Sequence, residues 1–248
     1  MNPPAPAAVT DRRRAWSLTV TSLAIAAIAV TPYLTTSLDA LAAEDSGLAR
    51  GYVDEPVVIL IAFYTHVMAG GTALLLSPWQ LWPGLRRRRP GLHRWSGRVI
   101  LSAIAVAGLS GLVLAPVNQA GAVGTLGFGA LGVLWLWTSW QGYRAIRAHD
   151  VEQHREWMTR AFALTFAAVT LRVWTGALVG AQELALGESF DAETAFVRSY
   201  AWVPFLCWVP NLVVAEWLVR RRRRRGHAEP DRSHAAPPAD EAAATTRT

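Results

Sequence analysis

The chain has 248 residues, of which 52% are hydrophobic and only 17% are charged, and its net charge is +6. The charged residues cluster between long apolar stretches, whereas a soluble protein needs polar residues along every element. This distribution excludes an ordinary soluble domain, and with it a nucleic-acid-binding role for the positive charge. It is typical of an integral membrane protein. The single cysteine, Cys207, excludes an intrachain disulfide and a metal site built on cysteines.

Six apolar runs are long enough to cross a bilayer, whose hydrocarbon takes about 20 residues of helix. Only helices and closed barrels can span, because unpaired backbone groups are costly in lipid, and long runs without alternation are helices. The sequence therefore predicts an all-α integral membrane protein with six transmembrane helices. The predicted spans are 17–38, 57–81, 99–117, 121–143, 157–180 and 199–219.

The arginines predict the orientation of these spans. All 24 basic residues are arginines, and all but three lie in the two tails and in the second and fourth connections. These segments share one side of the membrane, which the positive-inside rule identifies as the cytoplasm. We therefore expect a bacterial cell-membrane protein with both termini in the cytoplasm. Residues 1–16 are its N-terminal tail, 17–219 its membrane domain and 220–248 a basic and then disordered tail. The first run is too long for a signal peptide, so we expect a retained helix.

A repeat with an offset of 61 residues relates two parts of the chain. The "WQ" at 79–80 matches the "WQ" at 140–141, and the "HR" at 93–94 matches the "HR" at 154–155. The second and third spans thus correspond to the fourth and fifth. Two helices in each copy give both copies the same orientation, so this is a parallel repeat. We expect helices 2–5 of the six, over 57–180, to form a pseudo-twofold four-helix core; convergence of the two connections on similar residues is the alternative.

Polar side chains within the spans are the candidate functional residues, because they are expensive at membrane depth. His66 and Arg172 lie at comparable depth in the outer half, and neither has a repeat partner, since the matching residues are Gly127 and Gly111. With Asn211 in the sixth span they form the predicted polar core, where a bound anion or quinone carbonyl could accept hydrogen bonds. The alternative is structural: the arginine satisfies helix carbonyls or reaches outward, and the histidine bonds within the bundle.

His93 and His154 open the third and fifth spans at their cytoplasmic ends, and these two spans can be diagonal in a four-helix core. Their imidazoles could then ligate the iron of one b-type haem. The alternative is that each His-Arg pair anchors a helix end among the headgroups, which the neighbouring arginines and tryptophans favour. His149, in the connection, is a third candidate ligand.

Glu216 is an acidic residue inside the sixth span. Arg220, one turn further on, could neutralise it locally; Arg98 and Arg160, from other spans, are the alternative partners. The chain has no phosphate-binding loop, zinc motif or nucleophile elbow. An ATPase or hydrolase is therefore without support, and the sequence favours a protein that is not an enzyme.

Several stretches resemble a known family. The strings "HVMAGGTALLLSPWQ", "HRWSGR", "HREWMTRAFALTFAAVTLR" and "PNLVVAE" are similar to motifs of the bacterial membrane proteins grouped as domain-of-unknown-function family 2306, across residues 57–219. The resemblance implies a multi-pass membrane protein without assigning an activity. A weaker similarity, to the four-helix core of cytochrome b561, implies that His93 and His154 match one pair of haem ligands. His66 matches half of a second pair, whose partner is missing from 121–143.

Three functions remain open at this stage. The first is a non-enzymatic membrane protein that binds a small ligand or a partner at the polar core. The second is a b-type haem or quinone redox protein, and the third is a small transporter. Transporters often have broken helices at matching positions of their repeats, whereas Pro204 and Pro210 of the last span have no counterparts.

Overall fold

Every element formed by the residues that the computed structural model describes, 6–43 and 49–228, is a helix. The α-helices are α1 (Pro6–Thr35), α2 (Leu38–Ala43), α3 (Val57–Gln80), α4 (Pro83–Arg88), α5 (Pro90–Leu114), α6 (Gly121–Arg147), α7 (Val151–Thr165), α8 (Ala167–Leu186), α9 (Ala192–Tyr200), α10 (Val203–Leu206) and α11 (Val209–Ala228). Short 3-10 turns lie at Ala49–Gly51, Ala115–Val117 and Gly187–Ser189. The sequence predicts disorder after Arg225, whereas α11 continues to Ala228; residues 229–248 lie outside the described part.

Six helical segments are long and apolar enough to cross a membrane, as the sequence predicts. Large apolar side chains remain exposed on their outer faces, among them Ile28 and Leu126 at 66% and 68% exposure. Such faces fit contact with lipid rather than water. The six segments are Trp16–Thr35, Val57–Gln80, Pro90–Val117, Gly121–Arg147, Val151–Ser189 and Val203–Arg225.

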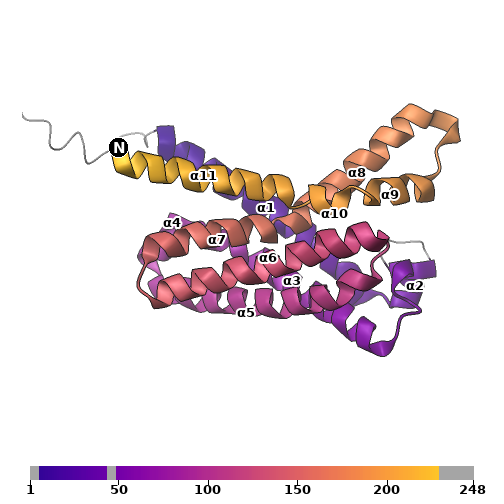
Figure 1. Ribbon diagram of the computed structural model, residues 1–248, viewed down its shortest axis with the longest axis horizontal. Helices are drawn as coiled ribbons and strands as arrows, with labels where there is room; N and C mark the ends of the chain where they lie inside the picture. Colours follow the sequence, from indigo (N-terminus) through magenta and orange to yellow (C-terminus); the bar gives the residue numbers. More distant parts are fainter. Residues whose placement is uncertain (1–5, 44–48, 229–248) are drawn as a thin grey trace, which may run out of the picture.

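The four predicted core spans pack as one bundle of α3, α5, α6 and α7 (Figure 1). Helix α5 packs along α3 on one side and α6 on the other, and α7 packs along α6 and also contacts α3. The helices that carry His93 and His154 are therefore diagonal. The buried centre takes four small or aliphatic residues from α5, together with Ala73 from α3, Trp135 from α6 and Leu164 from α7. Small residues allow this close approach.

The two ends of the bundle differ in charge. We call the end formed by α4, the start of α5 and the α6–α7 turn the basic end, because it carries Arg86–Arg89, Arg144 and Arg147. The opposite end, which carries α2, the turn at Ala49–Gly51 and α9, is called the acidic end. It is closed by a second buried cluster, in which Phe63 of α3 stacks on Tyr52 with ring centroids 4.6 Å apart.

The fifth span is not one straight helix. It bends at Phe166 between α7 and α8, although this stretch has neither proline nor glycine. The side-chain amide of Asn211 donates to the Ala163 carbonyl at 3.2 Å, and an unbroken helix would give that carbonyl to the N–H of residue 167. A side chain inserted into the backbone ladder is an established cause of such bends.

The sixth span is broken as well, between α10 and α11 at Cys207 and Trp208. Pro210 explains this break, since it has no N–H to give to the carbonyl of Leu206. The short helix α10 is seated against α6 at Gly127, where an added Cβ would lie 2.6 Å from Cβ of Pro204. The Trp208 indole donates to the Gly127 carbonyl at 3.1 Å, which fixes the break on α6.

Beyond the bend, α8 leaves the bundle. Its contacts are with α9, with α10 and with α1, and Figure 1 shows α8 and α9 projecting together from the four-helix core. Only Ala167 and Val169, at the start of α8, are buried. Helix α1 packs mainly along α3, so it covers the first copy of the repeat.

Candidate functional site

Asn211 joins the two helix breaks. Its amide nitrogen lies within hydrogen-bond distance of three oxygen atoms: Ala163 O at 3.2 Å, Cys207 O at 3.1 Å and Thr170 Oγ1 at 3.0 Å. The Thr170 hydroxyl in turn donates to the carbonyl of Cys207. One side chain thus serves backbone groups on both sides of the junction, which is how irregular backbone is tolerated at membrane depth. The two breaks lie in the fifth and sixth spans, not at matching positions of the repeat.

His66 lies inside the bundle between α3 and α5. Its Nδ1 is 2.8 Å from the carbonyl oxygen of Ala107. A carbonyl only accepts, so in the neutral ring Nδ1 carries the proton and Nε2 is left as an acceptor. The ring lies against Gly111, where an added Cβ would be 3.0 Å from both Cε1 and Nδ1. The tautomer and the orientation of this imidazole are therefore fixed by α5.

Arg172 lies one turn into α8 and is partly buried. Its Nη1 donates to the Ala168 carbonyl of its own helix at 2.8 Å. Within the described residues no acid forms an ion pair with it. The guanidinium is within electrostatic range of the His66 ring and of the hydroxyls of Tyr33 and Tyr200. The two residues of the predicted polar pair are thus within electrostatic range of each other, and α1 and α9 each place a tyrosine within range of Arg172.

Sequence reasoning did not select these tyrosines. Tyr200 is buried at the end of α9, and desolvation raises the pKa of its phenol. Burial also raises the pKa of Tyr52, and the nearby charge of Glu55 adds to the effect. Both hydroxyls are therefore neutral at physiological pH and can donate hydrogen bonds. Tyr52 lies outside the predicted spans and Tyr200 near the first residue of the sixth, so only the tertiary fold brings the two tyrosines to the acidic end.

At the basic end the two predicted haem ligands differ in their partners. The Nδ1 of His154 lies 2.7 Å from the Gly142 carbonyl, so this atom carries the proton and Nε2 is the acceptor. The Nδ1 of His93 is buried and has no hydrogen-bond partner in the described structure. The two rings are within electrostatic range of each other. His149 sits on the α6–α7 turn with a positive φ of 61°, and no hydrogen bond of its side chain is found in the described structure.

Two ion-pair clusters attach α11 to α7. Arg160 donates to Glu216 through Nε at 2.9 Å and Nη2 at 2.8 Å, and Arg220 donates to the other carboxylate oxygen at 3.0 Å. Glu216 therefore has both its local partner and one of the two long-range partners predicted for it. The second cluster pairs Arg223 with Glu156, which is 6% exposed. Both carboxylates are used in holding helices together.

Comparison with known proteins gives one match. The family described as "Predicted membrane protein (DUF2306)" matches residues 63–219, which is more than half of the chain. No curated protein and no solved structure matches. The similarity to cytochrome b561 stays an expectation from the sequence.

Proposed function

The chain belongs to the DUF2306 family of predicted membrane proteins, and from that premise we propose that it binds a small ligand inside its helix bundle. The ligand carries an anionic group or a carbonyl oxygen, as a carboxylate or a quinone does. It accepts hydrogen bonds from Arg172 and lies beside His66. The observation that supports this most is a partly buried arginine that has one backbone acceptor and no acid partner among the described residues.

An arginine in this position is costly unless its charge and its donors are matched. Four of its five N–H groups have no described acceptor, and the neighbouring imidazole and phenols give it no negative charge. A planar guanidinium binds carboxylates and carbonyl oxygens through two parallel hydrogen bonds. The protonated tyrosines at the acidic end add donors, and the Nε2 of His66 adds an acceptor for a hydroxyl on the ligand.

Thermal unfolding of the detergent-purified protein tests this proposal, with a short-chain benzoquinone and benzoate as probes. We expect at least one probe to raise the unfolding temperature. Arg172→Gln should weaken that probe by about tenfold or more, since a hydrogen bond to a charged group contributes about 1.5–3 kcal/mol. Arg198→Gln, an exposed arginine on α9, is the matched control and should leave binding unchanged.

Two results would contradict the proposal. One is a protein that neither probe stabilises, and the other is an Arg172→Gln variant that unfolds at the normal temperature and binds the probe as well as the native chain. Arg172→Lys separates charge from geometry, because lysine keeps the charge without the planar fork. It should recover only part of the affinity.

A b-type haem at the basic end is the second candidate, supported by His154. A histidine that ligates a metal usually donates its other N–H to a carbonyl or carboxylate, as His154 does to Gly142. His93 lacks such a partner, so the fit is complete for one ligand and incomplete for the other. If haem is bound, His93 and His154 hold its iron, and the group supplies one-electron redox chemistry.

The absorption spectrum of protein expressed with ample haem decides this candidate. A b-type α-band after reduction that disappears in His93→Ala and His154→Ala, and persists in the His149→Ala control, would establish it. A colourless native protein would exclude it. The quinone and haem candidates are separable, because Arg172→Gln affects the first and not the second.

The basic end faces the cytoplasm of a bacterial cell in this proposal, and both termini lie there. The support is the concentration of arginines at that end, from Arg86–Arg89 to the run at the end of α11. A fluorescent protein fused to the C-terminus should mature, whereas a C-terminal alkaline phosphatase should be inactive. The reverse pattern would place the termini outside.

A further inference from the structure

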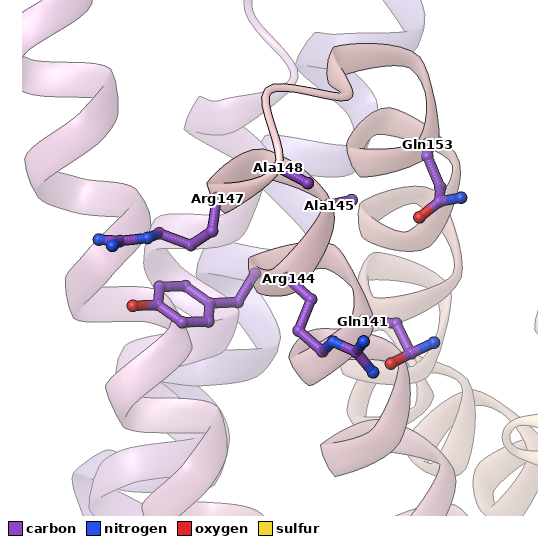
Figure 2. A pocket seen from close by; sticks show the side chains of 7 residues that line it. Gln141, Arg144, Ala145, Arg147, Ala148 and Gln153 are labelled. Carbon is purple, nitrogen blue, oxygen red and sulfur yellow. The ribbon is translucent and has the colours of Figure 1, made fainter.

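A hollow of about 470 Å³ lies at the turn between α6 and α7, at the basic end. Its polar lining comes from Gln141, Tyr143, Arg144 and Arg147 on α6 and Gln153 on α7. Figure 2 shows the side chains of Gln141, Arg144 and Gln153 extending to one side of the hairpin, whereas Arg147 extends to the other. Neither Gln141 nor Arg144 has a role in the polar core or at the haem candidate.

The hollow has hydrogen-bonding capacity that the protein does not use. In the described structure Arg144 forms no ion pair, and the Oε1 of Gln141 is buried without a donor. The nearby acids are engaged elsewhere: Asp150 accepts from the Gln153 backbone at 2.8 Å, and Glu152 pairs with Arg155 at 3.6 Å. A cationic fork and a buried acceptor thus line the same hollow, and an unmatched buried acceptor is unfavourable until a donor reaches it.

The depth of the hollow indicates what can reach it. It lies at the end of the Gly121–Arg147 span. Trp140 and Tyr143, on the same turn of α6, are 53% and 40% exposed, and their rings are 5.8 Å apart. Exposed tryptophan and tyrosine at the end of a span mark the level of the lipid headgroups. The hollow therefore opens where phosphodiesters are the most abundant anions, and basic pockets at this level bind anionic headgroups.

We propose that this hollow binds the headgroup of an anionic glycerophospholipid with a free hydroxyl, such as phosphatidylglycerol. Arg144 binds the phosphodiester, with the amide of Gln153 as a second donor. The headgroup hydroxyl donates to Oε1 of Gln141. A free glycerol phosphate has the same chemistry, but the position among interfacial aromatics favours the lipid.

Native mass spectrometry of the full chain in detergent tests this with three dioctanoyl lipids. Phosphatidylglycerol has the charge and the hydroxyl, phosphatidylethanol has the charge alone, and phosphatidylcholine has no net charge. We expect the native chain to prefer them in that order. Arg144→Gln should weaken phosphatidylglycerol binding about tenfold. Arg94→Gln, which changes an exposed arginine at the basic end outside the lining of the hollow, is the control and should change binding less than twofold.

Gln141→Leu tests the hydroxyl separately. It should abolish the preference for phosphatidylglycerol over phosphatidylethanol while leaving phosphatidylethanol binding intact. Free glycerol 3-phosphate, added as a competitor, distinguishes the two sources: competition lost in Arg144→Gln assigns the site to a soluble phosphate, and absence of competition assigns it to the lipid. The proposal is overturned if Arg94→Gln weakens binding as much as Arg144→Gln, or if none of the three lipids is preferred.

Discussion

The two copies of the repeat begin alike at the basic end and diverge towards the acidic end. In the first copy, α3 and α5 are continuous and have the most extensive contact of any two elements. In the second, α6 is continuous, but its partner bends at Phe166 and leaves as α8. The space beside α6 is taken by α10, through Pro204 on Gly127. The sixth span therefore completes the second copy.

At two positions of the repeat, one copy has a glycine where the other has a polar side chain. His66 of α3 corresponds to Gly127 of α6, and Arg172 of α8 corresponds to Gly111 of α5. In the first copy the imidazole rests on Gly111; in the second the ring of Pro204 rests on Gly127. Each glycine thus admits one ring, and the polar pair occupies the positions where the copies no longer match.

The largest loss of stability is expected from Gly127→Ala, which changes the packing of the second copy and leaves the first copy unaltered. Its Cβ would meet Pro204 at 2.6 Å and the Pro204 backbone at 2.9 Å, and backbone cannot rotate away. We expect a loss of about 2–3 kcal/mol of stability, the upper part of the overpacking range. Reversible unfolding in detergent measures it. Gly129→Ala, with nothing within 4 Å, is the control and should be neutral or stabilising by up to about 1 kcal/mol.

Asn211→Leu removes the hydrogen bonds that link the break in the fifth span to the break in the sixth span. The change leaves the carbonyls of Ala163 and Cys207 without this donor, and we expect a loss of about 1–2 kcal/mol. The distribution of distances between labels on α8 and α11, measured spectroscopically or by cross-linking, should become broader. Thr175→Val removes a hydroxyl that bonds only within α8 and should have almost no effect. Equal losses in both variants would mean that the junction has no special role.

Gly111→Ala tests the first copy and should cost about 1 kcal/mol. Its Cβ would lie 3.0 Å from the His66 ring, which the Ala107 carbonyl holds in place. The penalty should vanish in a His66→Ala background, because the atoms that clash are gone. A penalty that persists there would show that Gly111 matters for the backbone rather than for the histidine. Reversible unfolding in detergent measures these variants as well.

The smallest effect concerns α9, which the first copy lacks. The side chain of Asp191 accepts from the Thr194 backbone at 2.8 Å, and hydrogen bonds from Thr194 hold the pKa of its carboxyl below the ordinary value. Because the pKa of Asp191 is lower in the folded state, its hydrogen bonds stabilise α9 at pH values above the ordinary pKa. This stabilisation is lost as the pH falls through the lowered pKa of the folded state. Asp191→Ala should speed amide exchange in α9 at neutral pH, whereas Asp191→Asn should retain most of the protection. Unchanged amide exchange in Asp191→Ala would show that the Asp191 side chain does not stabilise the start of α9.

Much of the fold could be predicted because lipid imposes simple rules. Length and apolarity were sufficient to find six spans, and four sequence motifs were sufficient to recognise the family. The polar residues Asn211 and Glu216 were also recognised within the last span. The bend at Phe166 could not be read from the sequence, since no proline or glycine marks it. Its cause is an amide 45 residues further along the chain, at Asn211, and local patterns do not report contacts at that separation.

The sequence by itself determined the composition of the spans, the difference between the two ends and the residues that break the repeat. Those properties follow from hydrophobicity and charge, which act residue by residue. Only the tertiary structure decided that α8 leaves the bundle, that α10 replaces it on Gly127, and that Tyr33 and Tyr200 come within electrostatic range of Arg172. These depend on shape and on single hydrogen bonds between distant segments, which exist only once the helices have packed.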